Sequence, residues 1–371
     1  MRHLLFLSVS LFLFSCTNTH TDKMGHIEFG NIKASPEKEK IIMEDLKVSI
    51  KPIRLETNDD CLLGNITQLA DIDFLWIVAD RQVYKFDKDG NFIEKIGQKG
   101  QGPTEYIAPQ KIQIDAKKKN VYVMDYFGRK VVTYDYDGNF LKSLPLPEDY
   151  SLNNMFLNNS NLYYLSNNNS VKPDLLSCNT TTGKIDTISY RERTMGQEAF
   201  AGNTYMYNIK GNTYLYHYFN DTIYSFKNNQ LTPAYFLDLG NNMFTFKQLT
   251  VIGDETSEEP IDNPKMMLSN FIDTHRGIIL SYSVVSSWKM GSEPDMRFSF
   301  YDKEKQKMYP DAYFVSRDIP VFSIEDKDPI FASSDEKSIY TFKQAYDLIE
   351  EQIIEGLEDE DNPIIIQYTF N

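Results

Sequence analysis

The sequence predicts an all-β fold, a six-bladed β-propeller, from two observations. Residues 83–92 and 131–140 are near-copies, and each has the pattern of an alternating apolar strand, an Asp-Gly turn and the start of a second strand. β-Hairpins that recur at a fixed interval are typical of propeller blades. The apolar position of Val83 recurs at steps of 48, 44, 48, 75 and 41 residues, at Val131, Leu175, Ile223, Phe298 and Ile339. Because a four-stranded blade takes about 40–50 residues, six such positions predict six blades.

The end of the chain predicts how the ring is closed. Apolar residues at helical spacing between residues 342 and 357 predict one helix in the last blade. Asn362-Pro363 then turns the chain into a strand over residues 364–370. An unpaired strand would leave its backbone donors and acceptors open, so we expect it to pair with an N-terminal strand near residues 48–57. The N- and C-terminal strands would then close the propeller.

One of the five intervals is about 30 residues longer than a blade needs. Residues 241–270 supply the excess, and within them residues 253–260 are acidic and rich in turn formers. We expect a protruding loop there. Two interpretations stay open, a functional lid and a disordered insertion, because like charges and Pro260 favour disorder as much as a lid.

The N-terminus predicts export. Residues 1–15 combine a basic Arg2, an apolar run of about eleven residues and a small residue before Cys16, which is the pattern of a signal peptide. Residues 13–16, Leu-Phe-Ser-Cys, resemble a bacterial lipobox, which implies that Cys16 is acylated; the alternative is ordinary cleavage that leaves Cys16 a plain thiol. Residues 16–40 are then expected to be a polar tether, and residues 41–371 the propeller.

Charge and cysteine content narrow the partners. The net charge is −15, so nucleic acid and anionic lipid surfaces are poor partners, and we expect membrane contact through the lipid anchor only.

Cys61 and Cys178 fall in different repeat units. We therefore expect two separate, partly buried thiols; a disulfide between them is not indicated.

Four features together resemble a known family: the lipobox, the Phe/Tyr-Asp-x-x-Gly hairpins, the glycine-rich segment 97–106 and the closing Asn362-Pro363-Ile364 strand. The combination is similar to the six-bladed, NHL-like β-propeller lipoproteins of the Bacteroidetes, over residues 51–370. The resemblance implies a binding or scaffolding role in the cell envelope, anchored to the outer membrane, and no catalytic residue is carried over. Residues 17–22 lack the acidic cluster that would indicate surface export, which favours the periplasmic side.

Sequence motifs for catalysis and for cofactors are weak. Only His217 and His275 lie in the body, in different repeat units, so we predict no catalytic residue. Residues 97–103 lack the Lys-Ser/Thr of a phosphate loop and have Glu105 where a dinucleotide motif needs glycine, which favours a connection between blades. The Asp-Gly segments 87–90 and 135–138 fit hairpin turns better than calcium loops. No cofactor is predicted; a calcium or other metal ion at the ring axis remains open, without assigned ligands.

Candidate ligand-binding residues are aromatic, with one histidine among them. Most Tyr and Phe side chains are expected to fill the wedges between blades, but aromatic side chains at loop tips can stack on sugars. Trp288, in the loop 286–291, is the strongest candidate, together with the Asn-rich stretch 153–169; Tyr205, Tyr207 and His217 complete the set. Asp186-Thr187-Ile188 and Asp221-Thr222-Ile223 resemble a short O-glycosylation signal, although both threonines also fit ordinary strand positions.

These observations predict a lipid-anchored envelope propeller that binds a glycan, a peptide or a partner protein on one face of the ring, without turnover. The alternative is a metal-dependent propeller hydrolase or lyase that works through carboxylates and an axial metal ion. A third interpretation is a structural subunit of an envelope complex.

Overall fold

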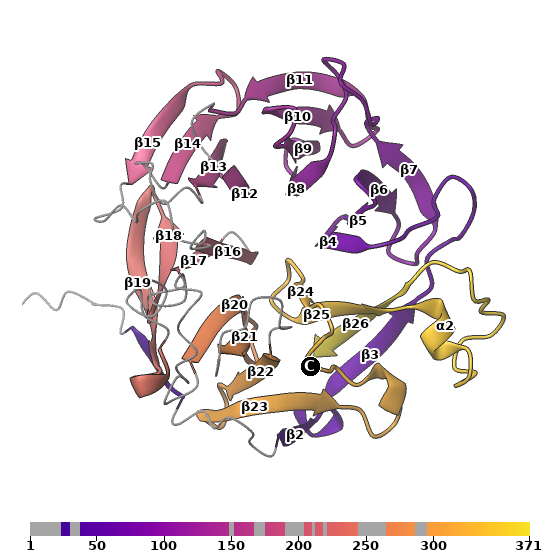
Figure 1. Ribbon diagram of the computed structural model, residues 1–371, viewed down its shortest axis with the longest axis vertical. Helices are drawn as coiled ribbons and strands as arrows, with labels where there is room; N and C mark the ends of the chain where they lie inside the picture. The colour runs from indigo at the N-terminus through magenta and orange to yellow at the C-terminus, as the bar shows by residue number, and fades with distance from the viewer. Residues whose placement is uncertain are drawn as a thin grey trace, which may run out of the picture.

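Six β-sheets surround a common axis, which confirms the predicted all-β six-bladed propeller (Figure 1). The structure is a computed structural model that describes residues 24–29, 38–147, 152–166, 175–189, 204–209, 212–217, 221–243, 265–285 and 295–371. Each blade has four antiparallel strands that run from the axis outward, blades 4 and 5 have a fifth strand at the outer edge, and the chain visits the blades in order around the ring.

The first three blades are regular. Blade 1 contains β4 (Ile66–Ile72), β5 (Phe74–Ala79), β6 (Gln82–Phe86) and β7 (Phe92–Ile96). Blade 2 contains β8 (Pro109–Asp115), β9 (Asn120–Asp125), β10 (Lys130–Asp135) and β11 (Phe140–Pro145). Blade 3 contains β12 (Leu152–Asn158), β13 (Asn161–Ser166), β14 (Leu175–Asn179) and β15 (Ile185–Ser189).

The other three blades also take strands from the N-terminal segment. Blade 4 contains β16 (Thr204–Ile209), β17 (Asn212–His217), β18 (Thr222–Lys227), β19 (Gln230–Asp238) and the edge strand β1 (Gly25–Glu28). Blade 5 contains β20 (Lys265–Asp273), β21 (Gly277–Val285), β22 (Asp295–Asp302), β23 (Lys307–Val315) and the edge strand β2 (Glu39–Ile42). Blade 6 contains β24 (Phe331–Ala332), β25 (Ser338–Lys343), β26 (Ile364–Phe370) and β3 (Val48–Ile53). The described helical turns are η1 (Glu44–Leu46), η2 (Gly240–Asn242), η3 (Pro320–Phe322) and α2 (Ala345–Leu348).

The predicted closure of the ring is confirmed. β3 pairs antiparallel with β26, with Val48 opposite Phe370 and Ile53 opposite Ile365. Figure 1 shows the two strands side by side as the outer half of blade 6. A strand from the N-terminal part of the chain therefore shares blade 6 with the C-terminal strand, which closes the ring and gives β26 a partner on both sides.

The repeat position was assigned to the wrong strand in the last unit. In blades 1 to 5 the aligned apolar residue lies in the third strand, but Ile339 lies in β25, the second strand of blade 6. The third strand there is β26, which follows α2 and the turns after it. The step of 41 residues from Phe298 to Ile339 looked like blade spacing because the long connection between β23 and β24, residues 316–330, makes up for the one strand fewer that the step spans.

The predicted tether of residues 16–40 is wrong for two segments. β1 pairs in parallel with β19, and β2, which begins at Glu39, pairs in parallel with β23. Ile27 and Phe29 are 1% and 3% exposed and pack between blades 4 and 5. This alternation of apolar residues is a strand signal within a segment that is otherwise polar.

The helix and the insertion are shorter than predicted. α2 covers only Ala345–Leu348, and the positive φ of Gln352 (51°) and Gly356 (65°) interrupts the expected helical stripe. Residues 265–270 belong to β20 and not to an insertion, while residues 244–264 lie outside the described residues.

The apolar core lies between the blades and leaves the axis free of a packed cluster. The described residues form six clusters, and each joins two neighbouring blades: blades 5 and 6, 4 and 5, 6 and 1, 1 and 2, 2 and 3, and 3 and 4. Many tyrosines are core residues, as expected, and Tyr106, Tyr134 and Tyr164 are at most 1% exposed. Cys61 and Cys178 are free and buried, as predicted.

Candidate functional site

A cavity of about 530 Å³ lies at the centre of the ring. Residues of four inner strands, β4, β8, β12 and β20, line it together with residues of blades 4 and 6, and these inner strands surround the axis in Figure 1. Its volume falls within the range of small-molecule sites, about 300–1,000 Å³. Rigid strands form most of the wall, so the groups that project from them are held in place.

The inner strands share a backbone irregularity that projects a polar side chain toward the cavity. In β4, β8, β12 and β20 the pairing register skips one residue, as in a β-bulge. The first residue paired after each irregularity lines the cavity; these residues are Gln68, Lys111, Asn154 and Asn270. Four blades therefore place an amide or an ammonium group at an equivalent position of the wall.

Some of the amides connect neighbouring blades. Gln68 Nε2 donates to Ile112 O (3.0 Å), and Ile112 N donates to Gln68 Oε1 (2.9 Å), which joins blades 1 and 2. Gln113 Oε1 accepts from Leu157 N (3.1 Å), which joins blades 2 and 3. Asn270 Nδ2 donates to Ile330 O (3.2 Å), at the side of blade 6. These contacts satisfy backbone groups at the inner edges of blades 2 and 3 and the Ile330 carbonyl beside blade 6.

Lys111 has no such contact. Among the described residues its Nζ has neither a hydrogen-bond acceptor nor a carboxylate partner, and it is the one cation among those that line the cavity. Burial lowers the pKa of Lys111, and no nearby carboxylate counteracts that effect. The ammonium is therefore partly desolvated and uncompensated in the cavity wall.

Two amide groups also keep unused donors. Asn154 Oδ1 accepts from Met155 N (3.0 Å), but its Nδ2 has no partner among the described residues. Gln113 is bonded through its oxygen only, so its Nε2 is likewise without a partner there. The described part of the wall thus offers an ammonium group and two amide donors to a ligand.

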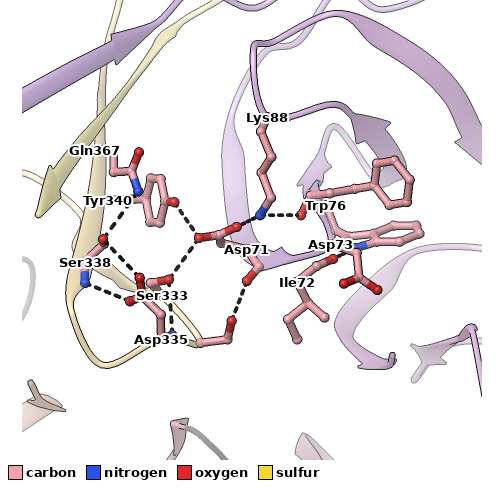
Figure 2. Close-up of polar contacts among 12 residues, drawn as sticks. Asp71, Ile72, Asp73, Trp76, Lys88, Ser333, Asp335, Ser338, Tyr340 and Gln367 are labelled. Carbon is pink, nitrogen blue, oxygen red and sulfur yellow. Dashed lines mark hydrogen bonds and ion pairs between the residues drawn. The ribbon is translucent and has the colours of Figure 1, made fainter. Parts of the chain in front are cut away.

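Asp71 is the one described carboxylate that lines the cavity, and it is fully engaged (Figure 2). Its Oδ2 accepts from Tyr340 OH (2.5 Å) and from Ser333 Oγ (2.9 Å), and its other oxygen pairs with Lys88. The Asp71 carbonyl accepts from Ser334 Oγ (2.7 Å). Burial raises the pKa of Tyr340, which keeps its hydroxyl a donor. Asp71 therefore joins blades 1 and 6.

The glycine-rich connection is structural, as predicted. Glu105 Oε2 accepts from Gly102 N (2.8 Å), and a Cβ at Gly100 would lie 1.8 Å from that oxygen. Tyr106 OH donates to Ile96 O (2.6 Å) and accepts from Gln82 Nε2 (2.5 Å). A carboxylate of the chain itself occupies this loop, which excludes a phosphate there.

The Asp-Gly segments are hairpin turns, which confirms that interpretation. Asp87 Oδ1 accepts from the backbone N–H groups of Asp89 and Asn91, both at 2.9 Å, and Asp135 bonds Asp137 and Asn139 in the same way. Burial raises the pKa of Asp87, but these hydrogen bonds outweigh it and the pKa is lowered. Among the residues that the structure describes, no three His, Cys, Asp or Glu side chains are grouped so that they could hold a metal ion.

The residues predicted to bind ligand are only partly described. Tyr205 and Tyr207 lie in β16, the innermost strand of blade 4, and His217 ends β17, but the side chains of all three lie outside the described part. Trp288 and Cys16 also lie outside the described residues. Of the two O-glycosylation candidates, Thr187 is exposed and Thr222 is half-buried, with its hydroxyl donating to Asp221 Oδ1 (3.0 Å).

Lys111, Gln68, Gln113 and Asn270 were not predicted, and Asn154 was expected only as a member of the Asn-rich stretch 153–169. Polar residues are common in these inner strands, and each of the five lies at a different distance from the repeat position of its blade. The equivalence of Gln68, Lys111, Asn154 and Asn270 could be recognised only from the pairing of the strands.

Residues 28–369 match the family described as a domain of unknown function, DUF4934. The chain belongs to this family. The matched region begins at the last residue of β1 and ends in β26, so it includes the edge strand β2 on blade 5 as well as the closing pair.

Solved structures show the same fold. A "Putative exported protein" from Bacteroides fragilis is 17% identical, with a TM-score of 0.71, and the match covers 94% of this chain and 100% of that one. A member of the DUF4221 family from Bacteroides vulgatus is 8% identical, with a TM-score of 0.54 and coverage of 87% and 98%. No curated protein matches the chain. In the described part of the DUF4934 protein, no helix has the length and apolar character needed to cross a bilayer.

Proposed function

We propose that this DUF4934 protein is a binding protein of the cell envelope and that its ligand, a glycan, a peptide or a segment of a partner protein, occupies the central cavity. The observation that carries the proposal is the set of unused donors, Lys111 Nζ, Gln113 Nε2 and Asn154 Nδ2, on an otherwise largely apolar wall. Small-molecule sites typically combine apolar walls with a few convergent polar groups.

The chemistry of the wall supports binding without turnover. Its free groups are donors, whereas Asp71, the one described carboxylate there, is occupied by Tyr340, Ser333 and Lys88. Lys111 is a free titratable group there, but the described lining residues include no free carboxylate or histidine that could complete a general acid–base pair with it. No arrangement of described side chains favours the alternative of a metal-dependent hydrolase or lyase.

We further propose that Cys16 is acylated after removal of residues 1–15 and anchors the ring on the periplasmic side of the outer membrane. The lipobox-like sequence supports this proposal, and so does the description of the Bacteroides fragilis relative as exported. Metabolic labelling with palmitate tests it. The wild-type chain should be labelled and Cys16→Ser should not; a soluble, unlabelled wild-type chain would contradict the anchor.

Thermal-shift measurements test the cavity as the binding site. The mature chain is screened against neutral and acidic monosaccharides, disaccharides and dipeptides, since a ligand that binds only the folded state raises the melting temperature. Ala116→Trp narrows the opening, because Ala116 is exposed and lines the cavity. Thr181→Trp, at an exposed turn of blade 3, is the matched control.

We expect at least one compound to stabilise the wild type and Thr181→Trp but not Ala116→Trp. Equal shifts in all three proteins would place the ligand elsewhere, and no shift with any compound would contradict the proposal.

A further inference from the structure

The cavity wall contains a charge without a counter-ion. Buried charges in folded proteins are normally paired, because an uncompensated charge loses its hydration and gains nothing in return. Lys111 has no acceptor and no carboxylate partner among the described residues. Among the described lining residues the one carboxylate, that of Asp71, is already bonded to other groups.

The neighbouring carboxylate does not supply the missing charge. Asp71 is bonded to two hydroxyl groups and to Lys88, and only burial shifts the pKa of Lys111. An anionic group of a ligand would be stabilised there by a charge-assisted hydrogen bond, which is shorter and stronger than a neutral one.

The rest of the wall suits a hydroxylated ring. The free amide donors of Asn154 and Gln113 can bond hydroxyl oxygens. The wall also contains Tyr214 and Phe271, whose ring centroids are 5.5 Å apart, and Phe331. Aromatic side chains of this kind pack against the apolar faces of sugar rings.

We propose that the cavity binds a sugar acid of the hexuronate class, with the ligand carboxylate on Lys111 Nζ and its hydroxyl groups on Asn154 and Gln113. This inference rests on the proposed function, since it names the ligand class of the same cavity.

Calorimetric titration of the mature chain with D-glucuronate and with D-glucose tests the inference. The two sugars differ only in the carboxylate, so their comparison isolates the contact to Lys111. We expect D-glucuronate to bind at least about tenfold more tightly than D-glucose, because a charge-assisted hydrogen bond is stronger than a neutral one; tenfold corresponds to about 1.4 kcal/mol.

Three variants locate the preference. Lys111→Met should abolish the preference for D-glucuronate, and Lys111→Arg, which retains a cation, should keep part of it. Lys117→Met removes the same charge from an exposed position in the hairpin after β8, and it should behave as the wild type. Lys111→Met removes an uncompensated charge, so we expect it to fold.

The inference is overturned if D-glucuronate does not bind at millimolar concentration, if D-glucose binds equally well, or if Lys111→Met keeps the preference. If one of these results is obtained but a compound of the thermal-shift screen stabilises the wild type and not Ala116→Trp, the hexuronate inference fails and the proposed function stands. If no panel compound binds, the proposed function fails as well.

Discussion

Two lysines in neighbouring blades show how differently this ring treats a buried charge. Lys85, in the wedge between blades 1 and 2, donates to Glu94 Oε1 (2.9 Å) and to Tyr136 O (2.5 Å), and its Nζ lies 4.6 Å from the Phe74 ring centroid. Lys111, on the cavity wall of blade 2, has none of these contacts among the described residues. The charge of Lys85 is therefore satisfied within the junction, whereas that of Lys111 has no partner among the described residues.

The contrast between Lys85 and Lys111 distinguishes polar groups that stabilise the fold from polar groups that remain available to a ligand. A charge whose donors are all used contributes to the fold, and removing it should destabilise the protein. A charge that is desolvated without a partner opposes folding, so its removal should stabilise the protein. Stability measurements can therefore test the assignment without knowledge of the ligand.

The largest effect is expected at the junction of blades 6 and 1. Deletion of residues 362–371 removes β26 and Asn362, whose Oδ1 accepts from Leu63 N (2.6 Å) and whose Nδ2 donates to Glu56 O and Cys61 O. We expect loss of cooperative unfolding, measured by thermal denaturation. Deletion of Asn371 alone, which is exposed, is the control. A truncated protein with the melting temperature of the full chain would refute the closure.

Lys85→Met tests a satisfied junction. The change removes both hydrogen bonds and leaves Glu94 without its partner, so we expect the free energy of unfolding to fall by about 3 kcal/mol. Denaturant titration measures this effect, with the exposed Lys117→Met as the control. If Lys85→Met leaves the unfolding midpoint unchanged, the contacts of Lys85 do not stabilise the fold, and Lys85 and Lys111 do not differ in the way described above.

Lys111→Met should stabilise the ligand-free protein by about 1–3 kcal/mol at neutral pH. The pKa of Lys111 is lower in the folded state than its ordinary value of 10.5, so the unfolded state binds the proton more tightly. The destabilisation of the wild type is therefore complete below the lowered pKa and disappears as pH rises from that value to 10.5.

Melting temperatures of both proteins across this pH range check the prediction. The difference in melting temperature between Lys111→Met and the wild type should be largest at neutral pH and should shrink at alkaline pH. Two other groups at the described wall titrate within or near this range: burial lowers the pKa of Lys88, the partner of Asp71, to about 8, and burial raises the pKa of Tyr214 to about 12. Both groups are present in the two proteins, so the difference between their melting temperatures isolates Lys111. A variant less stable than the wild type at neutral pH would indicate a structural role for Lys111.

The smallest effect is expected in a comparison of two asparagines at equivalent positions of the cavity wall. Asn154 and Asn270 both accept from the next backbone N–H at 3.0 Å, but only Asn270 also donates to the neighbouring blade, through Ile330 O. Asn270→Ala should therefore cost about 1 kcal/mol more than Asn154→Ala, as judged by denaturant titration. Equal losses would mean that the contact to Ile330 contributes no stability.

Part of this architecture could be predicted because it depends on local chemistry. The Asp-Gly turns at Gly90 and Gly138 have φ values of 93° and 72°, a conformation that favours glycine, so the hairpins are visible in the chain itself. Residues 364–370 were correctly expected to pair with an N-terminal strand because an apolar terminal strand needs a partner.

Other features depend on partners far away in the chain. Ile339 looks like the repeat position but lies one strand earlier, because α2 and its flanking turns separate β25 from β26. Ile27 and Phe29 are strand-like residues in a polar segment, and only β19 shows where they pack. Gln68 could not be recognised as a link between blades until Ile112 lay opposite it.

The sequence by itself determined the number of blades, the closure by both termini, the structural nature of the glycine-rich connection and the separate thiols of Cys61 and Cys178. These follow from turn chemistry, strand alternation and the need to pair backbone groups, all of which act over a few residues. Only the tertiary structure decided the N-terminal edge strands, the central cavity and the different surroundings of Lys85 and Lys111. The partner of a side chain depends on which strands lie next to each other in the ring. The spacing of residues along the chain does not specify those neighbours.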